Sequence, residues 1–148
     1  MSDKLLIVMV GFPRSGKTTW AREQKVPIVN PDSIRLAIHG KPFIGLAEPL
    51  VWATAKIMVR ALFLAGHNCV ILDATNVTRQ RRDDWRSSSW DTQFKHMHTN
   101  QDVCRERIMQ IDDTERRLGL LGALGKMYAQ FEPLGEDETA YFGVPSEL

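Results

Sequence analysis

The residues best suited to chemistry lie near the start of the chain. The phosphate-binding pattern G-x-x-x-x-G-K-[ST] is matched in full between residues 11 and 18. An apolar, β-branched run at 5–10 precedes the pattern, and 19–24 can begin a helix, which is the strand–loop–helix context that the pattern requires. Because glycines let the backbone curl, several N–H groups can point inward at an anion. The pattern therefore predicts a triphosphate site in which Lys17 contacts the β- and γ-phosphates and the Thr18 hydroxyl binds Mg²⁺. The residues expected to hold the nucleotide are Gly11, Arg14, Ser15, Gly16, Lys17, Thr18 and Thr19.

A carboxylate follows the apolar run 69–72. In phosphate-loop proteins an aspartate in this position lies beside the loop and orients Mg²⁺, so we expect Asp73 to be a metal ligand together with Thr18. The alternative is an aspartate that caps the turn before Thr75 and Asn76. Hydroxyl, amide and guanidinium groups at the same edge can hold a substrate phosphate or ribose. The residues expected to bind substrate are Arg35, Asp73, Thr75, Asn76 and Arg79.

Asp32 lies just past a short expected strand, 27–30. Ligands of open parallel sheets bind outside the carboxyl ends of the strands, and an attacking hydroxyl benefits from a carboxylate that takes its proton. Arg35 comes three residues later on the same helix face, where it can bind a phosphate of the acceptor. The alternative is that Asp32 caps the short helix 33–38 and forms a helical ion pair. The spacing alone leaves both interpretations open.

Several arginines are candidates for stabilising the charge of a transferred phosphoryl group, a role that an arginine on a lid can perform. Arg107 lies on a helix expected to begin at Asp102, and Arg116 and Arg117 lie on the next helical element. The alternative is that these are surface arginines of amphipathic helices. The most basic stretch of the chain is either a solvated helix face or a patch for a polyanion, and it contains Arg79, Arg81, Arg82 and Arg86.

The elements that must position these residues alternate between strand and helix. The strands are expected at about 5–10, 27–30, 68–72 and 93–98. A long helix is expected at about 46–65, with Val51, Ala55 and Met58 along its buried face, and two or three helices at about 102–131. This order predicts an α/β fold with three α/β/α layers and an open parallel sheet. We expect a single domain, 1–148, with a helical lid at about 101–120 and an irregular acidic tail at about 133–148.

Composition narrows the classes of protein. The chain has 148 residues and a net charge of +1, so no overall basicity indicates a nucleic-acid-binding protein. The two cysteines, Cys69 and Cys104, both have apolar surroundings and are expected to be buried, reduced thiols of a cytoplasmic protein. No stretch indicates a signal peptide or a membrane span.

Three segments together resemble a known family in order and spacing. Residues 11–21, 30–35 and 73–82 are similar to the kinase domain of phage polynucleotide 5′-hydroxyl kinase, and a weaker likeness extends through 104–107 to 127–133. The glycine loop is specific only for nucleotide binding. The Asp-x-x-Arg after the second strand and the Thr-Asn after the third indicate this particular subgroup of P-loop kinases. Related small phage proteins resemble kinases that phosphorylate hydroxymethylated pyrimidine bases in DNA.

The resemblance implies roles for individual residues. Asp32 is the general base, Arg35 holds the acceptor phosphate, Lys17 serves ATP and Arg107 matches the first lid arginine. The position of the second lid arginine is occupied by Ile111. Arg116 or Arg117 is the candidate to replace it.

The function expected from this resemblance is ATP- and Mg²⁺-dependent transfer of the γ-phosphoryl group to a hydroxyl on nucleic acid. DNA is the expected acceptor, and a phage-encoded protein acting in the host cytoplasm is the expected setting. The hydroxyl is either a polynucleotide 5′-hydroxyl or that of a hydroxymethyl-pyrimidine base. The alternatives are a kinase of small molecules or nucleotides, including toxin-like kinases, and an ATP-binding switch that is not a kinase.

Overall fold

A computed structural model describes residues 2–41 and 43–143 of the chain. Its centre is a sheet of four parallel strands in the order β2-β3-β1-β4. The strands are β1 (Leu5–Val10), β2 (Ile28–Val29), β3 (Cys69–Leu72) and β4 (Asp91–His96). β1 and β3 are buried on both faces, which explains why their sequences are continuous apolar runs without alternation.

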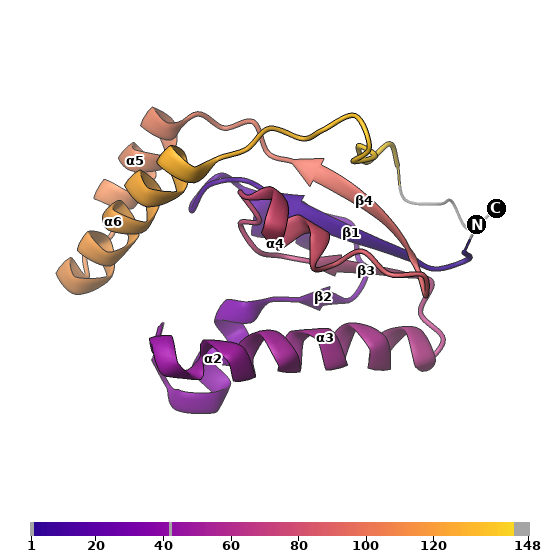
Figure 1. The fold of residues 1–148 in the computed structure, drawn as a ribbon. Coiled ribbons are helices and arrows are strands. Elements are labelled where there is room, and N and C mark those ends of the chain that lie inside the picture. Colours follow the sequence, from indigo (N-terminus) through magenta and orange to yellow (C-terminus); the bar gives the residue numbers. More distant parts are fainter. Residues whose placement is uncertain (1, 42, 144–148) are drawn as a thin grey trace.

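Helices cover both faces of the sheet, as Figure 1 shows for the layer that contains α3. The helices along the first part of the chain are α1 (Lys17–Glu23), α2 (Pro31–His39), the 3₁₀ turn η1 (Gly45–Ala47), α3 (Glu48–Leu64) and α4 (Arg79–Asp83). One set of alternate β1 side chains packs against α2 and α3, and the other set packs against α1. The expected three-layer α/β/α fold with an open parallel sheet is confirmed.

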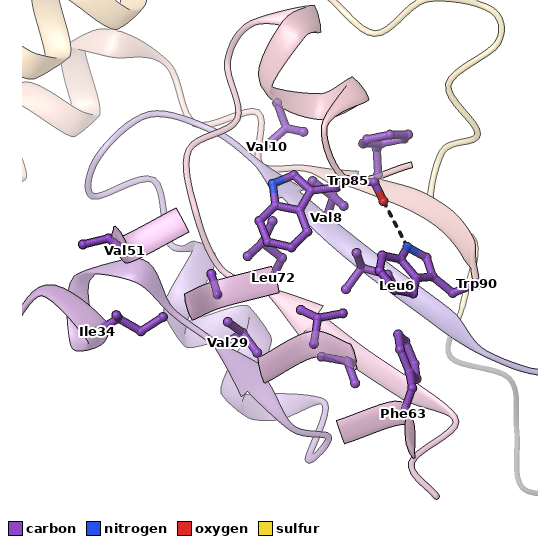
Figure 2. Packing of buried hydrophobic residues seen from close by; sticks show 14 residues of the cluster. Leu6, Val8, Val10, Val29, Ile34, Val51, Phe63, Leu72, Trp85 and Trp90 are labelled. Carbon is purple, nitrogen blue, oxygen red and sulfur yellow. Dashed lines mark hydrogen bonds between the residues drawn. The ribbon is translucent and has the colours of Figure 1, made fainter. Parts of the chain in front are cut away.

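The larger part of the core lies between the sheet and α3. Figure 2 shows Trp85 and Trp90 beside the β1 residues Leu6 and Val8, with the Trp90 indole N–H donating to the carbonyl of Trp85 at 3.0 Å. Both tryptophans are buried and Phe63 packs beside Trp90. These rings fill the space between layers and so fix the sheet on which the site is built.

Two helices form a separate unit at one end of the sheet (Figure 1). α5 (Gln101–Met109) and α6 (Thr114–Gln130) pack on each other through Cys104, Ile108 and Leu124, which form a small core of their own. Phe12 of the glycine loop packs against this core. The pair occupies the segment in which we expect a helical lid, and α6 continues ten residues beyond residue 120, the expected end of that segment.

The acidic tail is irregular as expected, but it is not detached from the domain. Residues 139–141 run beside β4, where the Phe94 N–H donates to Thr139 at 2.9 Å and the Tyr141 N–H donates to Phe94 at 2.9 Å. Glu138 is buried and accepts a hydrogen bond from Arg82 at 2.7 Å. The tail therefore covers an edge strand that would otherwise expose its backbone groups. Residues 144–148 lie outside the described residues.

Three expectations about the elements need correction. The cap of α2 is Asn30 rather than Asp32. The Asn30 side-chain oxygen Oδ1 accepts hydrogen bonds from the backbone N–H groups of Asp32 and Ser33, and Pro31 begins the helix. β4 begins two residues earlier than expected. α3 buries Val51 and Ala55 as expected, but Met58 is 38% exposed.

No helix of the described ranges has both the length and the apolar character needed to cross a membrane.

Candidate active site

The glycine loop between β1 and α1 contains two residues with positive φ, Gly16 and Arg14. Gly16 has a φ of 98°, a value that favours glycine. A Cβ added at Gly11 would lie 2.7 Å from the Ser15 Oγ and 3.3 Å from the Met97 Cβ, so a larger residue there would require the Ser15 side chain to move. Arg14 also has a positive φ, 64°, which is costly for a residue with a Cβ and marks a backbone held in a special conformation. The side chains of Arg14 and Thr19 are exposed beside it.

Lys17 is the buried cation of the loop. Its ammonium group donates to the carbonyl of Phe12 at 2.7 Å and approaches the Ser15 hydroxyl at 3.4 Å. Burial lowers the pKa of Lys17 to about 8, opposed by the charges of Asp73, Cys104 and Asp32. An ammonium that is so poorly solvated gains much from an anionic ligand, which is the electrostatic condition for binding a phosphate.

Asp73 joins the loop to two other elements. Its Oδ2 accepts a hydrogen bond from the Thr18 hydroxyl at 2.6 Å and another from the Asn30 amide at 3.0 Å. Asp73 is only 4% exposed. A hydroxyl and a carboxylate side by side fit the preference of Mg²⁺ for oxygen ligands from one or two protein groups and a substrate phosphate. Within the described ranges, no group of three or more His, Cys, Asp or Glu side chains could hold a metal.

A second charged cluster lies at the start of α2 and α3. Arg35 donates two hydrogen bonds to Glu48, at 2.9 and 2.7 Å, and one to Asp32 at 2.6 Å. The hydrogen bond from Arg35 holds the pKa of Glu48 below its ordinary value. The Asp32 side chain is 81% exposed, so its second oxygen is open to solvent. The cluster therefore presents an accessible carboxylate beside an arginine that Glu48 holds in place.

The two clusters lie at the same edge of the sheet. Asn30, two residues before Asp32, contacts Asp73, and the charge of Asp32 acts on Lys17. The structure thus brings together the two carboxylates that the sequence predicts for chemistry. This arrangement follows from the parallel sheet, because β2 and β3 are neighbours and both end at this edge.

Thr75 and Asn76 lie beside the loop through backbone contacts. The N–H of Gly11 donates to the Thr75 carbonyl at 3.0 Å. Asn76 is buried, has a positive φ of 44°, and its amide donates to the Met9 carbonyl at 2.8 Å. These contacts hold the segment after β3 against β1, and they give Asn76 a structural role in the turn that follows β3.

Arg107 is the lid arginine that reaches the loop. Its guanidinium donates to the Arg14 carbonyl at 3.0 Å. Arg117 instead donates to the Ile111 carbonyl at 2.7 Å and so closes the turn between α5 and α6. Of the lid arginines considered, Arg107 is therefore the one that the structure places at the phosphate loop.

The basic stretch on and after α4 is not an open patch. Arg82 is buried and paired with Glu138, while Arg86 pairs with Asp83. Every hydrogen bond of the Arg79 guanidinium goes to Asp83 or Asp137, so this expected substrate ligand is occupied by a structural ion-pair network. The interpretation as a single polyanion patch is wrong, because the acidic tail folds onto three of its four arginines.

Comparison with known proteins agrees with this geometry. Residues 6–134 match the family model described as an AAA domain. The chain belongs to this family. No curated protein matches the sequence of this AAA domain. Among solved structures, the domain is similar to a chain of the Pnkp1/Rnl/Hen1 RNA repair complex, with a TM-score of 0.64 and 20% identity over 89% of this chain and 47% of that chain.

Two further solved structures share the fold of this domain. A chain from a second Pnkp1/Rnl/Hen1 structure has a TM-score of 0.64 and 28% identity, over 76% of this chain and 42% of that one. The chain thus spans less than half the length of each of these two matched chains. A gluconokinase from Sinorhizobium meliloti has a TM-score of 0.61 and 22% identity over 95% of this chain and 82% of that one. The domain is a P-loop kinase-like domain whose structural neighbours include both a nucleic-acid repair complex and a sugar kinase.

Two residues of the AAA domain's site were missed by sequence reasoning. Asn30 caps α2 with its oxygen and holds Asp73 with its amide nitrogen. Its position before Pro31, a first-turn proline, was the available signal. Glu48 positions Arg35 from thirteen residues away, and no local pattern in the sequence indicates that pairing.

Proposed function

We propose that the chain is an ATP-dependent kinase that transfers the γ-phosphoryl group to a hydroxyl on nucleic acid. The observation that carries the proposal is the pairing of the exposed Asp32 carboxylate with Arg35 at the edge that holds the glycine loop. A carboxylate suits the proton of an attacking alcohol, and an arginine beside it suits an alcohol that itself carries a phosphate. The likeness to chains of the Pnkp1/Rnl/Hen1 complex, which one of the two structures describes as an RNA repair complex, supports the same acceptor class.

The loop residues bind and orient the phosphate donor. The backbone N–H groups between Gly11 and Lys17 surround the β- and γ-phosphates, and the Lys17 ammonium exchanges its carbonyl partner for phosphate oxygens. Thr18 and Asp73 hold Mg²⁺, which when bound supplies positive charge to the phosphates. Arg107, already in contact with the loop backbone, adds charge to the equatorial oxygens during transfer.

Asp32 acts on the acceptor. As the acceptor oxygen bonds to the γ-phosphorus, the bond from that phosphorus to the ADP oxygen breaks and the acceptor proton moves to the Asp32 carboxylate. Arg35 holds the acceptor phosphate, so the hydroxyl is positioned before the reaction begins. Glu48 fixes the guanidinium of Arg35 and keeps it from swinging away.

A sugar kinase is the second candidate, because the gluconokinase is matched over 82% of its own length, more than the repair-complex chains. The two candidates differ in the acceptor. A sugar without phosphate would leave Arg35 with no anionic partner other than Asp32 and Glu48.

One assay separates these candidates. The protein is incubated with γ-labelled ATP, Mg²⁺ and, in parallel, a 5′-hydroxyl DNA oligonucleotide, a 5′-hydroxyl RNA oligonucleotide, hydroxymethyluracil-containing DNA, gluconate and a panel of nucleosides. We expect label on one of the nucleic acids. Label on gluconate or nucleosides alone would reject the nucleic-acid acceptor, and release of labelled phosphate without any labelled acceptor would favour an ATP-binding switch.

A further inference from the structure

A cleft of about 650 Å³ opens between α4 and the end of α6, and it is not part of the site described above. It is bordered by the lid helix on one side and by the segment after β3 on the other. Its lining residues are Thr78, Gln80, Arg81, Asp84, Lys126, Gln130 and Glu132. The volume is enough for one nucleotide unit, since ligand pockets generally begin at about 300 Å³.

Two cations of this cleft are free to bind an anion. Arg81 is the one arginine of its stretch that the acidic tail does not neutralise, and neither Arg81 nor Lys126 forms a salt bridge among the described residues. Of the two acidic residues, the Glu132 carboxylate accepts a hydrogen bond from the Arg79 backbone N–H at 3.1 Å, whereas Asp84 receives the Lys56 ammonium on its backbone carbonyl, at 2.6 Å, and not on its carboxylate. Glu132 is thus partly engaged by a hydrogen bond, whereas neither Arg81 nor Lys126 is neutralised by a salt bridge among the described residues.

Trp52 connects the cleft to the acceptor carboxylate. The Arg81 guanidinium lies 4.6 Å from the centre of the Trp52 ring, and the Arg35 guanidinium lies 5.8 Å from the same ring. The charge of Arg81 also acts on Glu48, the partner of Arg35. A nucleic-acid strand with one phosphate at Arg35 would therefore find a second cationic side chain, Arg81, beside the same Trp52 ring.

Given the proposed kinase activity, we propose that this cleft is the subsite for the next nucleotide of a single-stranded acceptor. Arg81 and Lys126 bind its phosphodiester, and the amides of Gln80 and Gln130 face its base, whose edge offers both donors and acceptors. Because Lys126 lies on the lid helix and Arg81 on α4, the acceptor strand contacts both sides of the cleft. The subsite selects polymers over single nucleotides.

The test compares binding of a 5′-hydroxyl oligodeoxythymidylate with binding of thymidine 3′-monophosphate, in the presence of a non-hydrolysable ATP analogue and Mg²⁺. The wild-type protein should bind the oligonucleotide more tightly, and R81Q or K126Q should each reduce that preference about tenfold, as expected for loss of one charge-assisted contact. Each variant should also lower the slope of log affinity against log salt by about 0.7 for the oligonucleotide.

Matched variants separate charge from shape. R86Q removes an arginine from the same stretch that pairs with Asp83 and does not line the cleft, so it should keep the wild-type preference. R81K should retain most of the salt dependence because the charge remains. K126Q supplies an independent check, since Lys126 lies on a different helix and forms no cation–π contact with a ring of the described part of the chain.

The outcomes distinguish the two proposals. Labelled phosphate transferred to the oligonucleotide, with R81Q and K126Q binding it as the wild type does, overturns the subsite and leaves the kinase proposal standing. Binding that depends on Arg81 and Lys126 without any transfer supports the subsite and rejects the kinase proposal. An oligonucleotide that the wild-type protein does not bind overturns both.

Discussion

The two carboxylates of the site differ in almost every physical respect. Asp73 is 4% exposed and receives two hydrogen bonds on one oxygen, from Thr18 and Asn30. The Asp32 side chain is 81% exposed and receives one, from Arg35. Asp73 is therefore fixed by the fold, whereas Asp32 keeps an oxygen free for an incoming group. A buried carboxylate suits a metal held in constant geometry, and an exposed one suits a proton that must arrive with a substrate.

The difference also separates what the fold needs from what the reaction needs. A change at Asp73 disturbs three elements, since Thr18 lies in the first turn of α1, Asn30 caps α2 and Asp73 directly follows β3. A change at Asp32 disturbs only a surface ion pair, and such pairs contribute about 0–1 kcal/mol. The two positions should therefore separate stability from activity.

The largest effect is expected for Asp32→Asn. Because the amide cannot take a proton, kcat should fall by about 10²–10⁴-fold, while ATP affinity and the free energy of unfolding stay near the wild-type values. Initial rates with labelled ATP and a denaturant titration measure these quantities. Asp102→Asn is the matched control, because Asp102 is likewise the second residue of its helix and pairs with an arginine three residues later. Near-normal turnover in Asp32→Asn would remove Asp32 from the role of base.

A smaller loss of activity, accompanied by a loss of stability, is expected for Asp73→Asn. The apparent affinity for Mg²⁺ should fall by about 10–100-fold, since the metal loses a charged ligand. The free energy of unfolding should fall by about 1–3 kcal/mol, because a buried amide N–H₂ replaces an acceptor oxygen. Magnesium titration of the transfer rate and urea unfolding test both. A variant that is as stable as Asp32→Asn would contradict the contrast between the two carboxylates.

The smallest effect is expected at His96, whose side chain is linked to the glycine loop through Phe131. Its ring stacks on Phe131, which contacts Phe12 of the loop. Burial, with the nearby charges of His98 and Arg82, lowers the pKa of His96 to about 4. The unfolded chain binds this proton near pH 6.5, so the contribution to stability is complete above 6.5 and is lost as the pH falls toward 4.

Because the His96 ring is partly exposed, the free energy of unfolding should fall by about 1–2 kcal/mol over this pH range. Urea unfolding at pH 4.5 and pH 7 measures it. His96→Gln should flatten the dependence of stability on pH over this range, and His67→Gln, at an exposed position after α3, should leave it unchanged. An identical pH dependence in His96→Gln and the wild type would assign the acid sensitivity to other groups.

The loop side of the site was predictable because its geometry is local. Gly11, Gly16 and Lys17 act through backbone conformation over eight residues, and the apolar run before them predicts the strand on which they depend. The position of Asp73 beside the loop follows from the parallel sheet. The fold class was predictable for the same reason, since strand and helix periods alternate along the chain.

The acceptor side was only partly predictable because its geometry is not local. Asp32 and Arg35 are three residues apart and were expected together, but Glu48, which positions Arg35, comes from another helix. For the basic stretch the sequence left a solvated helix face and a polyanion patch open, and it did not indicate that Glu138, more than fifty residues away, folds back to neutralise Arg82. Pairings between distant charged side chains leave no periodic trace in a sequence.

The Arg82–Glu138 pair has a consequence for where the folded unit ends. The family match stops at residue 134, four residues before Glu138. A chain trimmed to that match would strand a guanidinium that is 0% exposed without its counterion, and breaking such a pair costs about 3–5 kcal/mol. That is a large part of the net stability of an ordinary domain. The segment that the stable fold needs therefore extends past the end of the family match, at least to Glu138.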